Sequence, residues 1–309
     1  MKRLRTVFMG TPDFAVPCLE KLTEISEVVG VVTQPDKPRG RGKKLTPSPV
    51  KAFAESHGIL VLQPPKVKAE EFVAAMEELA PDLIVVVAFG QILPQRLLDV
   101  PPLGCVNVHA SLLPRYRGAA PMQRCLMDGV RRTGVTTMFM DAGLDTGDML
   151  LREELYVGAD MTLAELHDAL SVMGAGLLAR TVGAIAEGTV TRTKQDDSLS
   201  SYAAMISKET GRIDWTRPAA ELHNLVRALD SWPGAYTTLD GQTYKIWRTR
   251  AKEGAGEPGR VVGRTKDGLI VAAGDGVLEI TELQAPGKKR MSAADYLRGR
   301  AIPEGSVFV

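Results

Sequence analysis

The sequence predicts an α/β protein: a Rossmann-like domain built on a parallel sheet, followed by a small, OB-like β-barrel. Up to about residue 188, continuous apolar runs alternate with helical segments, which is typical of a parallel sheet covered by helices on both faces. After about residue 205, short strands joined by tight turns favour an antiparallel barrel. A chain of 309 residues is also longer than one hydrophobic core usually supports, so two domains are expected.

Four apolar runs are the predicted strands at the start of the first domain. They cover residues 4–9, 28–33, 60–62 and 83–87, and the last is the clearest. The helices between them have recognisable starts, because Ser48 precedes a proline in a first turn, and Thr162 with Glu165 forms a capping box. The helix that begins at this box is expected to run to about Glu187.

A linker and a second domain follow. Residues 188–200 are polar and charged and show no periodicity, so the predicted domains are residues 1–188 and 206–309, joined by a linker over 189–205. One helix is expected over residues 218–229. Two hairpins come next: strands 235–239 and 242–247 flank Asp240-Gly241, and strands 269–273 and 277–283 flank a Gly-Asp-Gly turn. These hairpins predict the barrel.

Composition and charge limit the classes of function. The net charge is +1, so a nucleic-acid partner would have to be held by local basic clusters. The three cysteines show no CxxC spacing, which argues against a disulfide framework or a structural zinc site and fits a reducing compartment. No metal is expected. The longest apolar run, residues 83–89, is far shorter than the roughly 20 residues that cross a bilayer, so we expect a cytoplasmic protein without a membrane partner, and a monomer by default.

The stretch from Cys105 to Pro114 contains the first candidate active-site residues. Strand alternation places Asn107 and His109 on one face, at the end of a strand. A lone histidine is usually a packing or surface residue, but this chain has only four histidines and this one is paired with an amide. Asp145 lies in a second loop, which follows an apolar strand over residues 135–140. We expect the two strand ends to bring these three side chains together.

The three residue types suit acyl transfer to an amine. Attack on an acyl carbon builds negative charge on oxygen, which the Asn107 amide could stabilise by roughly 3 kcal/mol. His109 suits the proton that must leave the amine and reach the departing nitrogen, and Asp145 could orient and charge-stabilise the imidazole or relay the proton through a water. No serine or cysteine nucleophile is required, so direct transfer is the simpler mechanism.

The turn after the first strand, Gly10-Thr11-Pro12, lies at the edge where open α/β sheets bind ligands. It lacks GxGxxG, and no acidic residue ends the second strand, so a nicotinamide cofactor is not expected. Two interpretations stay open for this turn: a loop that caps the next helix, or a contact with the ligand.

A basic run occupies the loop between the second strand and the next helix. Its five positive charges are Lys37, Arg39, Arg41, Lys43 and Lys44. Such a run is usually a solvated surface. However, its glycines and its place at the same edge of the sheet as the candidate site make binding to a phosphate backbone a second interpretation. The basic run at 288–290 offers a less specific phosphate contact in the second domain.

At these residues the chain resembles the methionyl-tRNA formyltransferases, and the resemblance runs through both domains. The shared motifs are Gly-Thr-Pro-Asp-Phe at 10–14, Pro-Ser-Pro-Val-Lys at 47–51, Asn-x-His at 107–109, Ser-Leu-Leu-Pro at 111–114, Arg-Gly-Ala-Ala-Pro at 117–121, Gly-Leu-Asp-Thr-Gly-Asp at 143–148, Ile-Asp-Trp at 213–215 and Pro-Gly-Lys-Lys at 286–289. The Asn, His and Asp set and the Ser-Leu-Leu-Pro segment are similar to folate-dependent formyltransferases in general. The basic loop and the barrel point to the tRNA branch. An alanine follows His109 where this family often has glycine.

The resemblance implies 10-formyltetrahydrofolate as the formyl donor and the amino group of methionine on initiator tRNA as the acceptor. By position, Asn107, His109 and Asp145 carry over as the catalytic residues. The positions that carry over to the folate site are Ser111, Leu112, Leu113, Pro114, Phe89, Gly90, Ile92 and Asp141. The positions that carry over to tRNA binding are Lys37, Arg39, Arg41, Lys43, Lys44, Lys288 and Lys289, with Arg41 the central candidate.

Two alternatives stand beside this interpretation. A folate-dependent formyltransferase that acts on a small amine would not need the basic loop or this barrel. A non-catalytic RNA-binding protein on the same fold would bind tRNA without turnover, and the intact set of Asn107, His109 and Asp145 argues against it.

Overall fold

The computed structural model describes residues 3–39 and 44–309, and the chain divides into two compact units. Unit 1 comprises residues 1–118, 132–155 and 167–202, and unit 2 comprises residues 119–131, 156–166 and 203–309. The predicted α/β domain followed by an antiparallel β domain is confirmed. Unit 2 also takes two segments from the first 188 residues, so the chain passes between the units more than once.

Unit 1 is built on a seven-stranded sheet with the order β5-β2-β1-β6-β7-β8-β9. Its strands are β1 (Arg5–Gly10), β2 (Glu27–Val32), β5 (Val61–Leu62), β6 (Leu83–Val87), β7 (Cys105–His109), β8 (Arg132–Phe139) and β9 (Met149–Tyr156). The strands from β5 to β7 in this order pair in parallel, whereas β7 and β8 are antiparallel. The predicted parallel sheet therefore forms the core of a mixed sheet, because β8 joins it in the antiparallel direction.

The strand β9 was not predicted from the sequence. Along most of β9, at the edge of the sheet, partly buried side chains alternate with exposed ones. It therefore lacks the continuous apolar run that marks a strand covered on both faces, such as β6, all of whose residues are buried.

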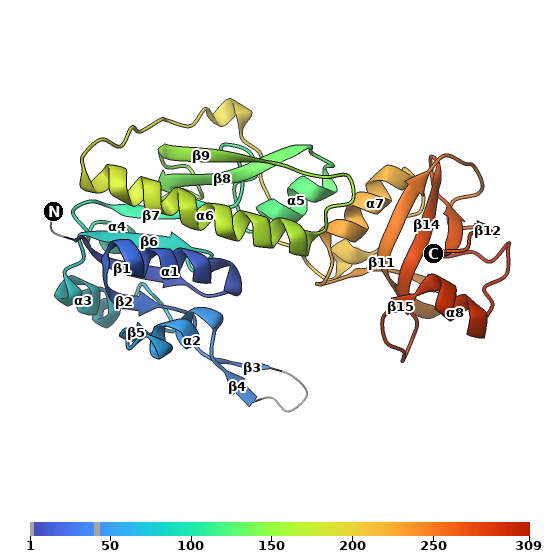
Figure 1. The fold of residues 1–309 in the computed structure, drawn as a ribbon, viewed down its shortest axis with the longest axis horizontal. Helices are drawn as coiled ribbons and strands as arrows, with labels where there is room; N and C mark the ends of the chain where they lie inside the picture. Colours follow the sequence, from blue (N-terminus) through green and yellow to red (C-terminus); the bar gives the residue numbers. More distant parts are fainter. Residues whose placement is uncertain (1–2, 40–43) are drawn as a thin grey trace. The chain divides into compact units, whose positions relative to one another are not determined.

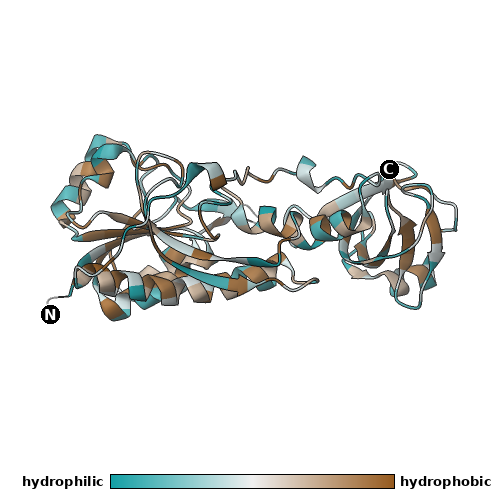
Figure 2. Cartoon of the chain, turned by 90° about the horizontal axis from the view of Figure 1, so that it is seen from above, coloured by the Kyte–Doolittle hydropathy of each residue, from teal (hydrophilic) through white to brown (hydrophobic). Residues whose placement is uncertain are grey.

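Helices cover both faces of this sheet, and Figure 2 shows its apolar strands between two helical layers. On one face, α3 (Glu70–Leu79) and α4 (Gln95–Leu98) pack against alternate residues of β1 and β6. Cys105, the first residue of β7, belongs to this same cluster. Side chains two residues apart share a face of a strand, so Asn107 and His109 lie on the face that α3 and α4 cover.

On the other face lie α1 (Val16–Ile25) and α6 (Leu163–Ala186), drawn in front of the sheet in Figure 1. The packing there is close, because a Cβ at Gly174 of α6 would lie 3.2 Å from a Val108 methyl group and 3.7 Å from Cys18 Sγ. The short helix η1 (Asp13–Ala15) leads from β1 into α1. Because helices cover both faces of the sheet, the loops lie at the ends of the strands, including the carboxyl ends where the candidate site residues lie.

The long helix α6 begins at the predicted capping box. The Thr162 N–H and hydroxyl donate to Glu165 Oε2, both at 2.8 Å, and the Glu165 N–H donates back to Thr162 Oγ1 at 3.4 Å. Of the helices described, α6 is the one long and apolar enough to cross a membrane by length and composition, a test that a core helix also passes. It packs on unit 1, where Ser171 Oγ donates to the Phe14 carbonyl at 2.8 Å.

The basic loop contains a short hairpin in its described part. β3 (Lys37–Arg39) pairs antiparallel with β4 (Lys44–Thr46), and α2 (Pro49–Ser56) follows. As predicted, Ser48 caps α2 by accepting the Lys51 N–H at 3.0 Å. The Lys51 ammonium in turn donates to Asp36 Oδ2 at 2.7 Å and to Gln63 Oε1 at 2.9 Å. These bonds tie the base of the hairpin to unit 1.

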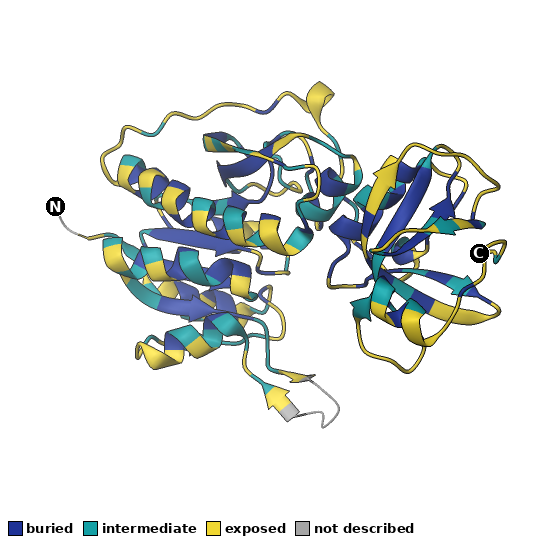
Figure 3. Ribbon diagram, turned by 45° about the vertical axis from the view of Figure 1, so that its right-hand side comes forward, coloured by how far each residue is buried: buried dark blue, intermediate teal, exposed yellow. Residues whose placement is uncertain are grey.

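Unit 2 is an antiparallel sheet with the order β10-β11-β14-β13-β12, and β15 pairs with β14. Its strands are β10 (Ala235–Leu239), β11 (Gln242–Lys252), β12 (Val261–Arg264), β13 (Leu269–Ala272), β14 (Val277–Gln284) and β15 (Met291–Ser292). Both predicted hairpins are present. Figure 3 shows buried residues in dark blue along its strands.

The last residues of the chain join the two edges of this sheet. Val309 exchanges backbone hydrogen bonds with Thr238 on β10, at 2.8 and 2.9 Å, and the Val261 N–H on β12 donates to the Ser306 carbonyl at 2.8 Å. Phe308, only 2% exposed, packs into the core between them. This C-terminal segment closes the sheet into a barrel.

Short helices complete the chain. In unit 2 they are α5 (Pro121–Met127), η3 (Glu209–Gly211), α7 (Ala219–Ala228) and α8 (Ala293–Gly299), and η2 (Asp197–Leu199) belongs to unit 1. The predicted helix over residues 218–229 is α7. Its apolar side chains Leu222, Leu225 and Val226 are buried in the core of unit 2, as their helical spacing requires.

Candidate active site

Open α/β sheets bind ligands at the carboxyl ends of the strands, at the point where the strand order reverses. In unit 1 this point lies between β1 and β6. From β1 the chain continues to β2 and β5 on one side of the sheet, and from β6 it continues to β7, β8 and β9 on the other side. At this edge, the Phe89 carbonyl accepts hydrogen bonds from Thr11 Oγ1 and from Gln34 Nε2, both at 3.2 Å. The Gln34 N–H donates to Thr11 Oγ1 at 3.4 Å, so the Thr11 hydroxyl ties the ends of β1, β2 and β6 together. In the described part of the chain, η1 has no side-chain cap.

The strand β7, next to β6, ends with the two candidate side chains. Asn107 and His109 alternate with Val106 and Val108, which are buried on the opposite face. His109 is 6% exposed, and Asn107 is half-buried. The two side chains therefore emerge together at the edge where a ligand would bind.

Asp145 reaches these residues from a loop that turns back, not from a neighbouring strand end. Because β8 runs antiparallel to β7, its last residue Phe139 pairs with Val106 near the start of β7. The reasoning that two strand ends would meet at one edge is therefore wrong here. The loop after β8 instead folds back toward His109, and Asp145 takes the left-handed conformation, with a φ of 54°. Such backbone strain in a non-glycine residue often occurs at functional sites.

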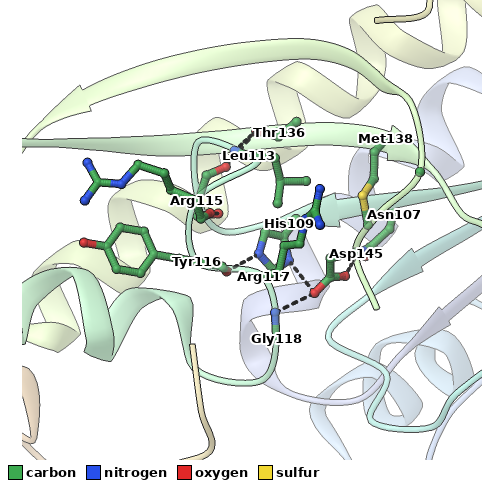
Figure 4. A network of polar contacts seen from close by, with 12 residues as sticks. Asn107, His109, Leu113, Arg115, Tyr116, Arg117, Gly118, Thr136, Met138 and Asp145 are labelled. Carbon is green, nitrogen blue, oxygen red and sulfur yellow. Dashed lines mark hydrogen bonds and ion pairs between the residues drawn. The ribbon is translucent and has the colours of Figure 1, made fainter. Parts of the chain in front are cut away.

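Three nitrogen atoms surround the Asp145 carboxylate, and two of them donate hydrogen bonds to it, as Figure 4 shows. The Gly118 N–H donates to Oδ2 at 2.7 Å, Asn107 Nδ2 donates to Oδ1 at 3.5 Å, and His109 Nδ1 lies 3.7 Å from Oδ2. The side chains of His109 and Asp145 are 7% and 14% exposed. Charges and hydrogen bonds act strongly in such a buried place, because little water screens them.

A hydrogen bond to Tyr116 assigns the tautomer of His109. Nε2 lies 2.8 Å from the Tyr116 carbonyl, which can only accept, so Nε2 carries a hydrogen. In the neutral imidazole Nδ1 then has a lone pair, and this atom faces Asp145 Oδ2. Nδ1 and Oδ2 are then both hydrogen-bond acceptors and repel each other. A proton on Nδ1, or an N–H donor of a bound ligand, would remove this repulsion. Nδ1 is therefore the atom that can exchange a proton.

Gln195 holds the Asp145 loop and was missed by the sequence analysis. Its Nε2 donates to the carbonyls of Asp145 and Gly147, both at 2.8 Å, and its Oε1 accepts from Arg117 Nε at 3.0 Å. Gly147 is required in this loop, since a Cβ there would lie 1.7 Å from the Phe139 carbonyl oxygen. Gln195 lies in the predicted linker, where no periodicity or motif signals that a glutamine becomes 93% buried.

A thiol near the site is inert. Burial raises the pKa of the Cys105 thiol to about 12, so it stays protonated and is a poor nucleophile. Among residues 3–39 and 44–309, no group of three or more His, Cys, Asp and Glu side chains could hold a metal ion. The side chains that gather at the candidate site offer an amide donor, an imidazole and a carboxylate.

Comparisons with known proteins agree over almost the whole chain. The family model described as "Formyl transferase" matches residues 4–182, and the one described as "Formyl transferase, C-terminal domain" matches residues 205–301. A methionyl-tRNA formyltransferase of Geobacter metallireducens is 56% identical over 306 residues, which cover 99% of this chain and 98% of that protein. The chain belongs to the methionyl-tRNA formyltransferase family. The protein of the same name in Geobacter sulfurreducens is 53% identical and covers 99% of this chain and 97% of its own length.

Solved structures outside the methionyl-tRNA formyltransferase family share the fold at low identity. An N-formyltransferase of Helicobacter canadensis, in complex with folinic acid and dTDP-3-aminofucose, is 18% identical with a TM-score of 0.66, covering 92% of this chain and 100% of that one. HypX of Aquifex aeolicus in complex with tetrahydrofolic acid is also 18% identical, with a TM-score of 0.63, covering 96% and 47%. At this identity the likeness concerns the fold alone.

The Ser-Leu-Leu-Pro segment, which the family resemblance assigns to folate, forms a tight turn after β7. The Ser111 hydroxyl donates to a backbone carbonyl of the same turn at 2.7 Å. Leu113 is fully buried, and its N–H donates to Thr136 Oγ1 at 3.1 Å. Leu112 and Pro114 are half-buried. Of these four positions, Leu112 and Pro114 offer side-chain surface to a ligand.

The remaining positions assigned to folate lie near the ends of β6 and β8. The Phe89 ring is 3% exposed in the core, Gly90 has a φ of 86°, and Ile92 is 82% exposed. Asp141 is exposed and braces the Asp145 loop by accepting the Thr146 hydroxyl at 2.7 Å. It also lines a cavity of about 320 Å³. Other residues that line this cavity are Phe139, Met140, Thr146, Gly147, Arg192 and Gln195.

The positions that the methionyl-tRNA formyltransferase resemblance assigns to tRNA fall in both units. On the β3–β4 hairpin of unit 1 lie Lys37, Arg39 and Lys44. Arg41 and Lys43 lie outside the described residues. Lys288 and Lys289 are exposed in the turn between β14 and β15 of unit 2.

Proposed function

We propose that this protein transfers the formyl group of 10-formyltetrahydrofolate to the α-amino group of methionyl initiator tRNA. The observation that carries the proposal is the partly buried cluster of Asn107, His109 and Asp145, at the ligand-binding edge of the sheet in a chain of the methionyl-tRNA formyltransferase family. The amine attacks the formyl carbon directly, because the cluster offers no nucleophile of its own. We assign no step to a metal.

Asn107 is proposed to stabilise the formyl oxygen. This oxygen gains negative charge as the amine attacks, and a fixed amide donor at such a position lowers the barrier by about 3 kcal/mol in comparable enzymes. The hydrogen bond from Asn107 Nδ2 to Asp145 is long, at 3.5 Å. Little binding energy is therefore lost when the amide donates to the substrate instead.

His109 is proposed to accept and return one proton at Nδ1. The attacking nitrogen has a proton to lose, and the departing folate nitrogen needs one. The hydrogen bond to Tyr116 leaves Nδ1 without a hydrogen in the neutral ring, so Nδ1 can take the first proton. Asp145 would stabilise the imidazolium until the proton passes to the leaving nitrogen. The bond from the formyl carbon to the folate nitrogen then breaks, which releases formyl-methionyl-tRNA and tetrahydrofolate.

Binding is assigned to separate surfaces. The folate donor is proposed to lie against the surface offered by Gly90, Ile92, Leu112 and Pro114 and beside the loop of Asp141. The tRNA is proposed to contact the β3–β4 hairpin and the turn at 288–289, where basic side chains can pair with phosphates. We further propose that the protein acts as a monomer in the cytoplasm, without a membrane partner.

The decisive experiment is formyl transfer by the full-length protein, with methionyl initiator tRNA and methionyl elongator tRNA compared as acceptors. We expect formyl-methionine on the initiator tRNA, with a much higher kcat/KM than on the elongator. Formylation of a small amine but of neither tRNA would establish the alternative formyltransferase. Normal tRNA binding without turnover would establish a non-catalytic RNA-binding protein.

A further inference from the structure

Unit 2 presents an aromatic side chain to solvent beside a group of basic residues. Trp232, between α7 and β10, is 56% exposed, whereas Trp215 and Trp247 are 4% and 7% exposed. A single exposed apolar side chain is common on soluble proteins and needs no explanation. This indole differs because its loop is anchored among cations. The group formed by Trp232, Lys245, Lys288, Lys289 and Arg290 is named the Trp232 patch.

Two basic side chains of the patch anchor the loop that carries Trp232. Arg290 donates to both carboxylate oxygens of Asp230, at 2.8 and 3.3 Å. Lys245 Nζ donates to the Pro233 carbonyl at 3.0 Å. Asp230, two residues before Trp232, is therefore tied to the turn that precedes β15, and Pro233, directly after Trp232, is tied to β11. A side chain presented from an anchored loop loses less conformational entropy on binding than one on a free loop.

The same two basic side chains pack on a buried indole. The Arg290 guanidinium carbon lies 4.9 Å, and Lys245 Nζ lies 5.4 Å, from the centre of the Trp247 ring. Gly234, which ends the loop, lies so close to this ring that a Cβ would come within 2.9 Å of it. The Trp247 ring thus packs against the Trp232 loop and against the charged groups of both Arg290 and Lys245.

Lys288 and Lys289 complete the patch. They directly precede Arg290 in a tight turn, in which the Lys288 N–H donates to the Ala285 carbonyl at 3.0 Å. Both lysines therefore belong to the same turn as Arg290, whose guanidinium holds the Trp232 loop. Over residues 3–39 and 44–309, neither lysine forms an ion pair with a carboxylate.

The carboxylates of this region are already paired. Arg290 binds both Asp230 and Glu282, and its hydrogen bond holds the pKa of the Glu282 carboxyl below its usual value. The patch therefore combines an exposed indole with the ammonium groups of Lys288 and Lys289, which have no fixed acidic partner among the residues that the structure describes. Aromatic stacking platforms beside cations are the means by which proteins bind single-stranded nucleic acid.

We propose that the Trp232 patch stacks on an unpaired base of RNA, while Lys288 and Lys289 bind the adjacent phosphates. The proposal rests on the proposed function, which supplies a tRNA as the partner. It assigns to Trp232 a contact that is independent of sequence, because every base offers a π-face.

The first test measures the affinity for initiator tRNA over a range of salt concentrations. We expect Trp232→Leu to weaken binding roughly 5- to 100-fold without changing the salt slope, and Trp232→Phe to keep most of the affinity. Lys289→Ala should lower the slope by about 1, because it removes a phosphate contact. The matched control is Tyr156→Leu, which removes another exposed aromatic ring, at the last residue of β9.

The second test uses tryptophan fluorescence, since Trp232 is the exposed one of the three tryptophans. We expect initiator tRNA, and a single-stranded RNA of roughly 8 nucleotides, to protect the wild-type emission from acrylamide, and duplex RNA to protect it less. Unchanged acrylamide quenching together with unchanged affinity of Trp232→Leu would overturn the stacking site, even if the wild type formylates tRNA normally. Equal losses of affinity in Trp232→Leu and Tyr156→Leu would overturn it too. Absence of formyl transfer by the wild type would overturn the proposed function instead.

Discussion

The candidate active site of unit 1 and the Trp232 patch of unit 2 are built in opposite ways. In the candidate site, His109 and Asp145 are largely buried, and both bond to fixed backbone groups. In the Trp232 patch, the indole is more than half exposed, and Lys288 and Lys289 have no acidic partner within the part of the chain that the structure describes. The candidate active site holds a few reactive atoms in fixed positions. The Trp232 patch leaves its basic side chains available to a negatively charged partner.

This difference indicates where a substitution should act. A side chain removed from the buried site leaves its partners mispositioned where little water can replace it, so the loss should be large and should appear in kcat. A side chain removed from the exposed patch takes away one of many contacts with the bound tRNA. That loss should be modest and should appear in affinity and in its salt dependence.

The largest effect is expected from the candidate catalytic residues. Asn107→Ala and His109→Ala should each lower kcat by ~10²-fold or more, because each removes a group that acts on the reacting atoms. Steady-state kinetics with methionyl initiator tRNA measures this, and tRNA affinity measured separately should stay near the wild-type value. If either variant keeps a near-native kcat, the assignment of that residue is wrong.

A smaller loss is expected from the positioning residue Gln195. Gln195→Ala and Gln195→Glu should each lower kcat by about tenfold with little change in the KM for tRNA, since both lack the N–H groups that hold the carbonyls of Asp145 and Gly147. Gln242→Ala, at an exposed position of β11, is the control and should behave like the wild type. A Glu variant as active as the wild type would show that these two hydrogen bonds do not position Asp145.

The basic loop provides a test in which only binding should change. Arg41→Ala should weaken tRNA binding by a few-fold and reduce its salt slope by about 1, because one phosphate contact is lost, while folate binding and kcat stay unchanged. Binding titrations at several salt concentrations measure both quantities. An unchanged slope would reduce the loop to a solvated surface and would leave the Trp232 patch as the better-supported RNA contact.

The smallest effect is expected from His223, a partly buried histidine that lies outside both regions. Like His109, it faces a carbonyl and a carboxylate: Nε2 lies 3.2 Å from the Ala159 carbonyl and 3.3 Å from Asp160. Burial lowers its pKa below the ordinary 6.5. The unfolded chain therefore takes up a proton at a higher pH than the folded one, and this group should cost stability as the pH falls below about 6.5.

His223→Gln should remove that loss. Thermal unfolding at a series of pH values should show a flatter pH dependence below about pH 6.5, by a few degrees in Tm at most. The kcat of the variant should match the wild type, in contrast to His109→Ala. A large fall in the kcat of His223→Gln would contradict the assignment of catalysis to the histidine at position 109 alone.

The sequence by itself determined the features that depend on neighbouring residues. The fully apolar run of β6, the cap at Ser48, the capping box at Thr162 and the hairpin at Asp240-Gly241 all have local signals, and all are present. The shared face of Asn107 and His109 belongs to the same class, because the strand period of two residues is a local property.

Only the tertiary structure decided the features that join distant parts of the chain. The antiparallel direction of β8, the return of Asp145, the support from Gln195 and the closure of the barrel by residues 305–309 each depend on contacts that local propensity does not encode. The candidate site shows both cases. The shared position of Asn107 and His109 on β7 follows from strand periodicity. Asp145 is instead brought to the site by a loop whose path is set by its glycines and by Gln195, 50 residues away in the sequence.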